Sequence, residues 1–336
     1  MKSATIIGTG SYLPPIKVTN KDLEKKFDTS NEWINTKLGI KERRRATSKQ
    51  ATSDLAINAI QDALKNANLV PNDLDLIICS RHVGDYSHPA TACLIQHKIG
   101  AKNAAAFDMQ SGCSGFIFSV PTASSFINLG TYKNIAVVNV CLHSKYLNME
   151  QRWNAAVFGD GAGAVILGPT EKNKGILSYF LKSDGSGFDL LCKPGGGTRT
   201  PITHEVLDNK ELLYGVSSTE KNRKVFDFAV NVFPKSIKEA LAKTNLTIED
   251  IDIIISHQAN INIIKKGMEN LGLPMDKTFT TVHKYGNCAE ASIPITLSEA
   301  VKEKRIKKND IVAFTGFGAG LSWGSIIMKW TKGSQT

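Results

Sequence analysis

A helix-to-strand segment occurs twice in this chain, about half a chain apart. Residues 59–80 (AIQDALKNANLVPNDLDLIICS) align without a gap with residues 236–257 (SIKEALAKTNLTIEDIDIIISH), at a constant offset of 177 residues. Each copy predicts an amphipathic helix, a short Asn-Leu turn and a buried strand of β-branched residues. The sequence therefore requires a fold that accommodates the same α/β unit twice.

Two further pairs of segments repeat in the same order. KNIAVVNV (133–140) matches NDIVAFTG (309–316) at an offset of 176 residues, and SGCSG (111–115) matches YGNCA (285–289) at 174. Three pairs at nearly one offset indicate a duplication, so we predict two superposable α/β halves. Within each half, buried strands alternate with helices, which is typical of mostly parallel sheets covered by helical layers.

The division between the halves is predicted at a turn-rich segment, GPTEKNKG (168–175). A chain of 336 residues is long for one hydrophobic core, which agrees with two units spanning residues 1–172 and 173–336. Residues 184–224 are rich in glycine and charge and predict an inserted loop. That loop is either a solvated excursion or a cover over a substrate, and the sequence leaves both open.

The chain carries an excess of positive charge. Its 41 Lys and Arg residues outnumber 31 Asp and Glu residues, and the formal net charge is +10. Such a charge suits an anionic partner, which could be a phosphate-bearing small molecule, an acidic protein or nucleic acid. No zinc-ligand spacing or RNA-binding aromatic motif accompanies the basic clusters, so we expect neither nucleic-acid binding nor a metal site.

The cysteines and the apolar runs bear on the cellular setting. The six cysteines are scattered without CxxC pairs, and no signal peptide precedes the first apolar run. No run of about 18 consecutive apolar residues is present, so the sequence predicts no membrane span. We expect a cytoplasmic protein with reduced thiols.

Three chemically distinctive residues follow strands at comparable places in the two halves. Cys113 and Asn287 occupy matching strand-to-helix junctions. His257 comes directly after the repeated strand of the second half. Ligands of open α/β sheets gather at the carboxyl ends of strands, so we expect these three side chains to converge on one pocket.

The chemistry of these side chains suits thioester exchange and carbanion formation. A thiol at a helix N-terminus faces unpaired N–H groups and the positive end of the helix dipole, which favours the thiolate of Cys113. His257 and Asn287 offer N–H donors for a carbonyl oxygen that becomes negative, as in an enolate. From the residues alone, an inert buried cysteine and a satisfied core histidine remain open alternatives.

Several specific motifs occur along the chain in a fixed order. They are TSNEWI followed by KLGIKERR, Cys113 in CSGF, FGDGAGAVIL (158–167), His257 in HQAN, Asn287 in YGN followed by SIP, and FGAGLSWGS (317–325). Together they resemble β-ketoacyl-acyl-carrier-protein synthase III and its relatives in the thiolase superfamily. The resemblance covers residues 3–330, essentially the whole chain.

The resemblance implies a fold and a reaction. The fold is α/β and thiolase-like, with duplicated βαβαβαββ halves in a five-layer αβαβα arrangement, and the protein is a homodimer. Cys113 takes the acyl group of an acyl-CoA, and a malonyl thioester then loses carbon dioxide and attacks it. His257 and Asn287 hold the malonyl thioester, which is either malonyl-CoA or malonyl-acyl-carrier protein (malonyl-ACP). No cofactor is required, and the 3-oxoacyl product initiates fatty-acid synthesis.

The resemblance also implies binding residues. The backbone N–H groups of Cys113 and Ala319 form an oxyanion hole. The residues expected to bind coenzyme A are Trp33, Lys37, Arg152 and Asn260. The residues expected to line the acyl pocket are His88, His143, Phe158 and Phe317. The resemblance also implies an acyl-carrier protein as a partner. Asp227, Asn262 and Glu269 weaken that expectation, because they replace basic residues that the family often uses to dock it.

Departures from the family pattern concern the acyl group. His88 stands where one subunit commonly lends the other an aromatic gate, and His143 stands where an aliphatic wall is usual. These imidazoles favour an acyl group with a polar or aromatic end. Arg81 either meets a substrate carboxylate or lies on the surface, and Glu290 replaces a usual small residue.

These departures keep alternative functions open. One is a specialised condensing enzyme of the quinolone, pyrone or resorcinol type. Another is an acyltransferase that uses Cys113 without decarboxylation, although His257 and Asn287 argue against it. A third, from a different class, is a non-catalytic protein that only binds coenzyme A.

Overall fold

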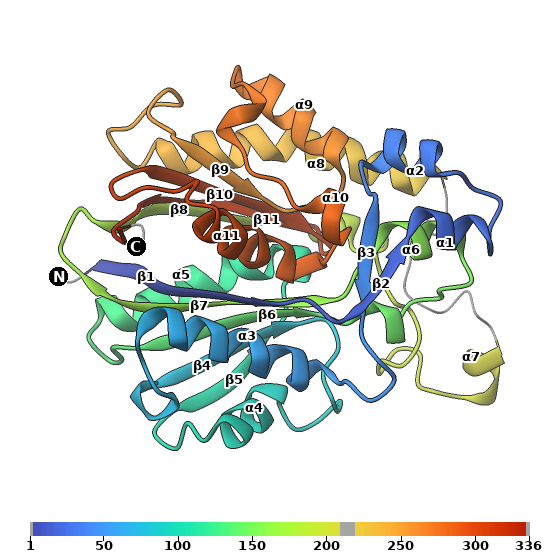
Figure 1. Ribbon diagram of the computed structural model, residues 1–336, viewed down its shortest axis with the longest axis horizontal. Coiled ribbons are helices and arrows are strands. Elements are labelled where there is room, and N and C mark those ends of the chain that lie inside the picture. The colour runs from blue at the N-terminus through green and yellow to red at the C-terminus, as the bar shows by residue number, and fades with distance from the viewer. Residues whose placement is uncertain (1–2, 209–218, 334–336) are drawn as a thin grey trace.

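Two β-sheets alternate with three helical layers in this computed structural model, which describes residues 3–208 and 219–333 (Figure 1). The helices α3 (Thr52–Ala67) and α4 (Thr91–Ile99) cover the outer face of one sheet. The helices α5 (Gly115–Asn128) and α11 (Ser292–Lys302) lie between the sheets. The helices α8 (Thr219–Leu241) and α9 (Ile261–Leu271) cover the other sheet. The predicted five-layer αβαβα arrangement is confirmed.

The strands follow the same order in both sheets. The first sheet has the order β1-β7-β6-β4-β5, from strands β1 (Ser3–Tyr12), β4 (Leu76–Arg81), β5 (Ala105–Met109), β6 (Ile135–Cys141) and β7 (Gly161–Thr170). The second has the order β8-β11-β10-β9, from strands β8 (Gly175–Ser183), β9 (Ile253–Ser256), β10 (Ile311–Gly318) and β11 (Ser322–Lys329). At the position equivalent to β5, the second sheet has an isolated bridge between Ile254 and Thr278.

The repeated sequence segments fall on equivalent elements. Residues 59–80 cover the end of α3 and most of β4, and residues 236–257 cover the end of α8 and β9. β4 pairs in parallel with β6 in the same way that β9 pairs with β10. The predicted duplication is therefore confirmed. The chain turns between β7 and β8 at residues 171–174, inside the predicted linker, while the two units 1–172 and 173–336 stay a prediction.

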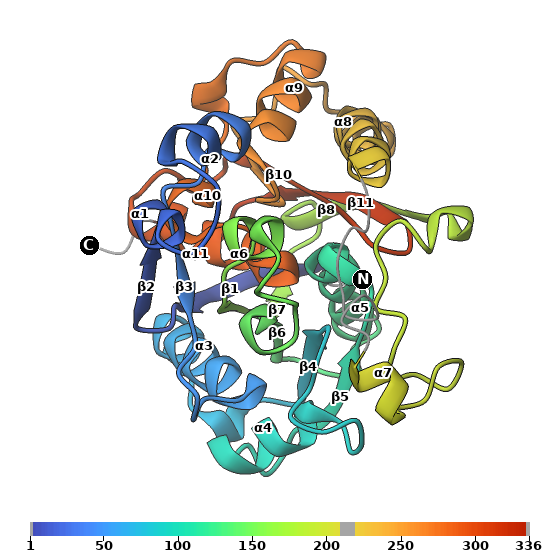
Figure 2. The ribbon, with the colours of Figure 1, turned by 90° about the vertical axis from the view of Figure 1, so that its right-hand side faces the viewer.

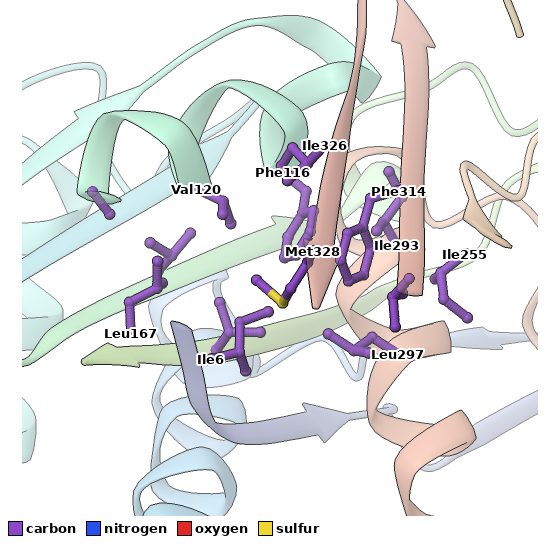
Figure 3. Close-up of a cluster of buried hydrophobic side chains, with 14 of the residues drawn as sticks. Ile6, Phe116, Val120, Leu167, Ile255, Ile293, Leu297, Phe314, Ile326 and Met328 are labelled. Carbon is purple, nitrogen blue, oxygen red and sulfur yellow. The ribbon is translucent and has the colours of Figure 1, made fainter. Parts of the chain in front are cut away.

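The middle helical layer forms a large core between the sheets. Phe116 and Val120 project from α5, and Ile293 and Leu297 project from α11 toward Met328 (Figure 3). Each of these side chains is at most 1% exposed. Full burial of such a side chain is worth roughly 1.5–3 kcal/mol, so this core fixes both helices firmly. Both helices matter for the site, because α5 follows the turn that carries Cys113 and α11 begins shortly after Asn287.

A group of short elements extends one end of the molecule. It consists of β2 (Ile16–Thr19), α1 (Asn20–Glu24), α2 (Asn31–Leu38), β3 (Glu42–Arg45), α6 (Arg152–Val157) and α10 (Val282–Tyr285). Figure 2 looks onto this end, with α6 near the centre of the view. The buried Arg43 and Arg45 side chains donate to the carbonyl oxygens of Ala156 (2.6 Å) and Ala155 (3.0 Å). These bonds satisfy carbonyl groups at the end of α6 and hold that helix in place.

The predicted insertion at 184–224 is partly regular. It contains a 3₁₀ turn at Gly185–Gly187, helix α7 (His204–Asp208) and the start of α8. Residues 209–218 of this insertion lie outside the described residues. Among the helices of the described chain, none is both long enough and apolar enough to cross a membrane.

Candidate active site

A cavity of about 580 Å³ lies beside the ends of strands from both halves. Its lining includes residues that follow β5 and β9 and residues at the end of β10. Cys113, His257 and Asn287 all line it, so the structure brings together the three residues that the repeat placed at strand ends. Two halves of the chain therefore contribute to one site, the thiol coming from the first half and the imidazole and amide from the second.

Cys113 lies in the 3₁₀ turn η2 (Gly112–Ser114), between β5 and α5, and is 5% exposed. Gly112 has a φ of +59°, and a Cβ at Gly318 would lie 2.5 Å from the Cys113 amide nitrogen. Both positions therefore need glycine. Burial raises the pKa of the Cys113 thiol and the Glu290 carboxylate raises it further. Burial therefore opposes the thiolate, and the predicted stabilisation of the thiolate by the helix N-terminus stays a prediction.

His257 follows β9 and is held through one ring nitrogen. Its Nδ1 lies 2.7 Å from the Ser292 hydroxyl, which also lies 2.7 Å from the carbonyl oxygen of Ala289. Nε2 is the ring nitrogen left for a ligand. Burial lowers the pKa of His257 to about 3, with a further contribution from His82, so the imidazole is neutral at physiological pH. The Ser292 hydroxyl can either accept from Nδ1–H or donate to Nδ1, so it accommodates both neutral tautomers of the ring.

Asn287 lies between the short helix α10 and the 3₁₀ turn η7 (Ala289–Ala291). The predicted strand-to-helix junction is therefore wrong for Asn287, whose backbone forms an isolated bridge with Phe158 and does not follow a strand. Its Oδ1 accepts the backbone N–H of Ala289 at 2.8 Å. Its own backbone N–H donates to the Val157 carbonyl oxygen at 2.9 Å, and its carbonyl oxygen accepts from Gly159 at 3.1 Å. With Oδ1 engaged, the amide presents its N–H groups to the cavity, which is the polarity needed to hold a developing negative oxygen.

The predicted oxyanion-hole residues lie against each other. A Cβ built at Gly112 would lie 3.0 Å from the amide nitrogen of Ala319, so the backbones around Cys113 and Ala319 are in close contact. Ser322 donates toward the carbonyl oxygens of Ser111 (3.0 Å) and Ala319 (3.1 Å). Ser322 thus links the backbone before Cys113 to the backbone at Ala319.

The predicted coenzyme A residues gather at the mouth of the cavity. Trp33, Arg152 and Asn260 line it, and the Arg152 guanidinium lies 4.7 Å from the centre of the Trp33 ring. Asn260 begins α9 as its N-cap and donates to the Lys37 carbonyl oxygen at 3.1 Å. The Lys37 side chain is exposed at the end of α2, next to the mouth, and does not line the cavity.

The predicted acyl-pocket residues divide into two pairs. Phe158 and Phe317 line the cavity, whereas His88 and His143 do not. His143 is 1% exposed and meets the edge of Phe158, with ring centres 4.9 Å apart. His88 is exposed in the loop after β4, and its reach into a partner subunit stays a prediction.

Arg81 is already engaged. Its guanidinium contacts Asp108 at 2.7 and 2.9 Å, and the same carboxylate accepts the backbone N–H groups of Thr91 and Ala92. This pairing opposes the idea that Arg81 meets a substrate carboxylate.

Sequence reasoning missed part of the cavity wall and the Ser292 hydroxyl that contacts His257. The cavity residues that it did not assign to the site are Leu38, Trp153, Val157, Leu191, Asn222, Arg223, Val225, Phe226, Phe228, Ala259, Ile263, Gly318 and Leu321. Leu191, Asn222 and Arg223 belong to the predicted insertion, so its glycine-rich composition was the available signal for a substrate cover. No sequence signal connected Ser292 with His257, because that contact depends on the fold.

The two α/β halves have equivalent strand orders and share one cavity. One half supplies a thiol to this cavity and the other supplies polar groups, which is the arrangement of a condensing enzyme of the thiolase fold. Residues 107–185 match the family model described as 3-oxoacyl-[acyl-carrier-protein (ACP)] synthase III, and residues 241–330 match its C-terminal model. This chain belongs to the β-ketoacyl-[acyl-carrier-protein] synthase III family.

Individual relatives match over almost the whole chain. The β-ketoacyl-[acyl-carrier-protein] synthase III of Caldanaerobacter subterraneus subsp. tengcongensis is 46% identical over 331 residues, covering 98% of both chains. That of Clostridioides difficile is 45% identical over 328 residues, again covering 98% of both. The crystal structure of 3-oxoacyl-[acyl-carrier-protein] synthase III from Aquifex aeolicus superposes with a TM-score of 0.89 at 38% identity, covering 97% of this chain and 100% of that one.

Proposed function

We propose that this protein loads the acyl group of an acyl-CoA onto Cys113 and condenses it with malonyl-ACP, giving the first 3-oxoacyl intermediate of fatty-acid synthesis. The observation that carries the proposal is that Cys113, His257 and Asn287 line one cavity whose mouth holds Arg152 stacked on Trp33. Membership of the β-ketoacyl-ACP synthase III family supports it.

The first half-reaction transfers the acyl group. The Cys113 sulfur attacks the thioester carbonyl while the neutral His257 accepts the thiol proton at Nε2, which avoids a free thiolate in a buried site. The backbone N–H groups of Cys113 and Ala319 stabilise the tetrahedral oxyanion. The carbon–sulfur bond of the acyl-CoA then breaks, and the thiolate of CoA leaves with the proton.

The second half-reaction forms the carbon–carbon bond. His257, protonated at Nε2 when the Ser292 hydroxyl donates to Nδ1, and Asn287 through its amide N–H donate to the malonyl thioester oxygen. The bond to the malonyl carboxylate breaks, carbon dioxide leaves, and the resulting carbanion attacks the acyl carbonyl on Cys113. The tetrahedral intermediate collapses, the carbon–sulfur bond to Cys113 breaks, and the Cys113 thiolate takes a proton from solvent.

The proposal extends to assembly and setting. We propose a cytoplasmic homodimer in which the loop after β4 meets the partner subunit. The exposed Tyr86 side chain (64%) and the exposed His88 in that loop support the contact between subunits.

Incubation with acetyl-CoA and malonyl-ACP tests the proposed reaction. We expect one carbon dioxide and one free CoA for each 3-oxoacyl-ACP, measured by gas release, thiol titration and carrier mass. Acyl transfer to another acceptor without carbon dioxide would contradict the proposal. Parallel reactions with malonyl-CoA and with aromatic acyl-CoAs distinguish the carrier-dependent enzyme from a specialised condensing enzyme.

Substitution of Arg152 by alanine should weaken acyl-CoA binding. Loss of the cation–π contact with Trp33 and of the positive charge should raise KM for acyl-CoA about tenfold while kcat changes less than about threefold. Steady-state kinetics over an acyl-CoA series measures this split. The matched control is Arg305→Ala, which removes an exposed arginine that stacks on Phe279 away from the cavity. An unchanged KM in the Arg152 variant would contradict the assignment.

A further inference from the structure

A buried ion pair joins the two halves of the chain beside the cavity. Glu290, in η7, accepts the backbone N–H of His82 at 2.7 Å through Oε1. Its Oε2 lies 2.5 Å from Nδ1 of the His82 ring. The two side chains are only 1% and 10% exposed, so the carboxylate has little access to water. A buried carboxylate of this kind needs a compensating charge.

The carboxylate lies close to Cys113. Glu290 is flanked by Ala289 and Ala291, which pack in one buried cluster with Cys113. Gly115, two residues after Cys113, approaches so closely that a Cβ there would lie 3.0 Å from the Glu290 Cβ. An uncompensated negative charge at Glu290 would therefore oppose negative charge on the sulfur.

The imidazole of His82 supplies the compensation. Burial lowers the pKa of His82, but the charge and hydrogen bond of Glu290 raise it by more, so the net shift favours the protonated ring. The His143 ring lies 5.1 Å from His82, and burial together with the charge of His82 keeps it neutral by lowering its pKa. Within the described part of the chain, the other titratable groups that interact with the pair include Cys79, Cys141, Tyr146, His257 and Cys288.

We propose that His82 is a charge-compensating positioning residue for acyl loading: its imidazolium neutralises the buried Glu290 carboxylate and so allows negative charge to develop on the Cys113 sulfur. The inference rests on the proposed function, because it takes Cys113 as the nucleophile. It assigns a role to two residues, one from each half, that act through Cys113 and do not touch substrate.

Two substitutions that each remove one charge test this role, His82→Gln alone and then combined with Glu290→Gln. His82→Gln keeps a hydrogen-bond donor but leaves the carboxylate uncompensated, so we expect iodoacetamide to alkylate Cys113 about tenfold more slowly at pH 7, with the rate profile shifted by about one pH unit to the alkaline side. Adding Glu290→Gln removes the negative charge and should return the rate to within about threefold of the native protein. Mass spectrometry of the Cys113 peptide separates it from the exposed Cys93.

Controls separate the charge effect from structural damage. His97→Gln removes an exposed imidazole from α4 and should leave the alkylation rate unchanged. A purely structural role for the pair predicts that the double variant reacts no faster than His82→Gln, and that result, or a His82→Gln rate within twofold of native, would overturn the inference. Native protein that gains no acyl adduct on Cys113 from acyl-CoA would instead overturn the proposed function.

Discussion

Cys113→Ala is expected to abolish acyl-enzyme formation and to lower the rate of CoA release from acyl-CoA by at least about 10³-fold. The thiol is the nucleophile in the proposed reaction, and no other group in the cavity supplies a sulfur in that place among the residues that the structure describes. Cys113→Ser should fail as well, because a buried hydroxyl is a far weaker nucleophile beside a neutral imidazole. Stopped-flow thiol detection of released CoA measures the rate.

The matched control for this prediction is Cys93→Ala. Cys93 is an exposed cysteine on α4 that donates weakly to the Ala106 carbonyl oxygen, at 3.7 Å. Its loss should leave CoA release within about twofold of the native rate. If the Cys113→Ala protein released CoA at a native rate while retaining an acyl group, the nucleophile would lie elsewhere.

Asn287→Ala is expected to slow malonyl decarboxylation and condensation about 10²–10³-fold, while acyl loading onto Cys113 falls less than about tenfold. The reason is that the Asn287 amide donates to the malonyl oxygen only in the second half-reaction. Release of labelled carbon dioxide from malonyl-ACP and burst release of CoA from acyl-CoA measure the two steps separately. His257→Ala should impair both steps, because its ring takes the thiol proton in the first and donates in the second.

Asn58→Ala is a suitable comparison for the Asn287 variant. Asn58 is exposed on α3 and donates to the Asp54 carbonyl oxygen within its own helix, at 2.7 Å. Both half-reactions should keep their native rates in it. Equal losses of loading and decarboxylation in Asn287→Ala would show that the amide supports the architecture of the cavity and not the enolate.

The fold could be predicted because its main signals are local and repeated. The apolar periodicity of α3 and the β-branched run of β4 are visible within a few residues, and their second copies in α8 and β9 reveal the duplication. The shortened third strand of the second half could not be predicted. Only the isolated bridge between Thr278 and Ile254 of β9 occupies its place, and this bridge depends on the neighbouring strand and not on a local sequence pattern.

The site could be predicted only as far as strand ends imply proximity. Cys113, His257 and Asn287 do line one cavity, but only Cys113 and His257 follow strands, whereas Asn287 follows α10. The strand-end rule could not give the protonation state of the Cys113 thiol, because solvation depends on the whole surrounding structure. It also missed the pair of His82 and Glu290, whose members are 208 positions apart and meet only because the halves pack together.

A pulse–chase measurement on the intact protein tests the central claim most directly. The protein is pulsed with isotopically labelled acetyl-CoA and divided into two samples. One sample is digested at once, the other is first chased with malonyl-ACP, and both are analysed by mass spectrometry. The account predicts that the label first resides on the Cys113 peptide and then moves to the carrier as a labelled 3-oxoacyl group, with one carbon dioxide for each transfer. Label that reaches the carrier without passing through Cys113, or that stays on Cys113 while carbon dioxide is released, would contradict it.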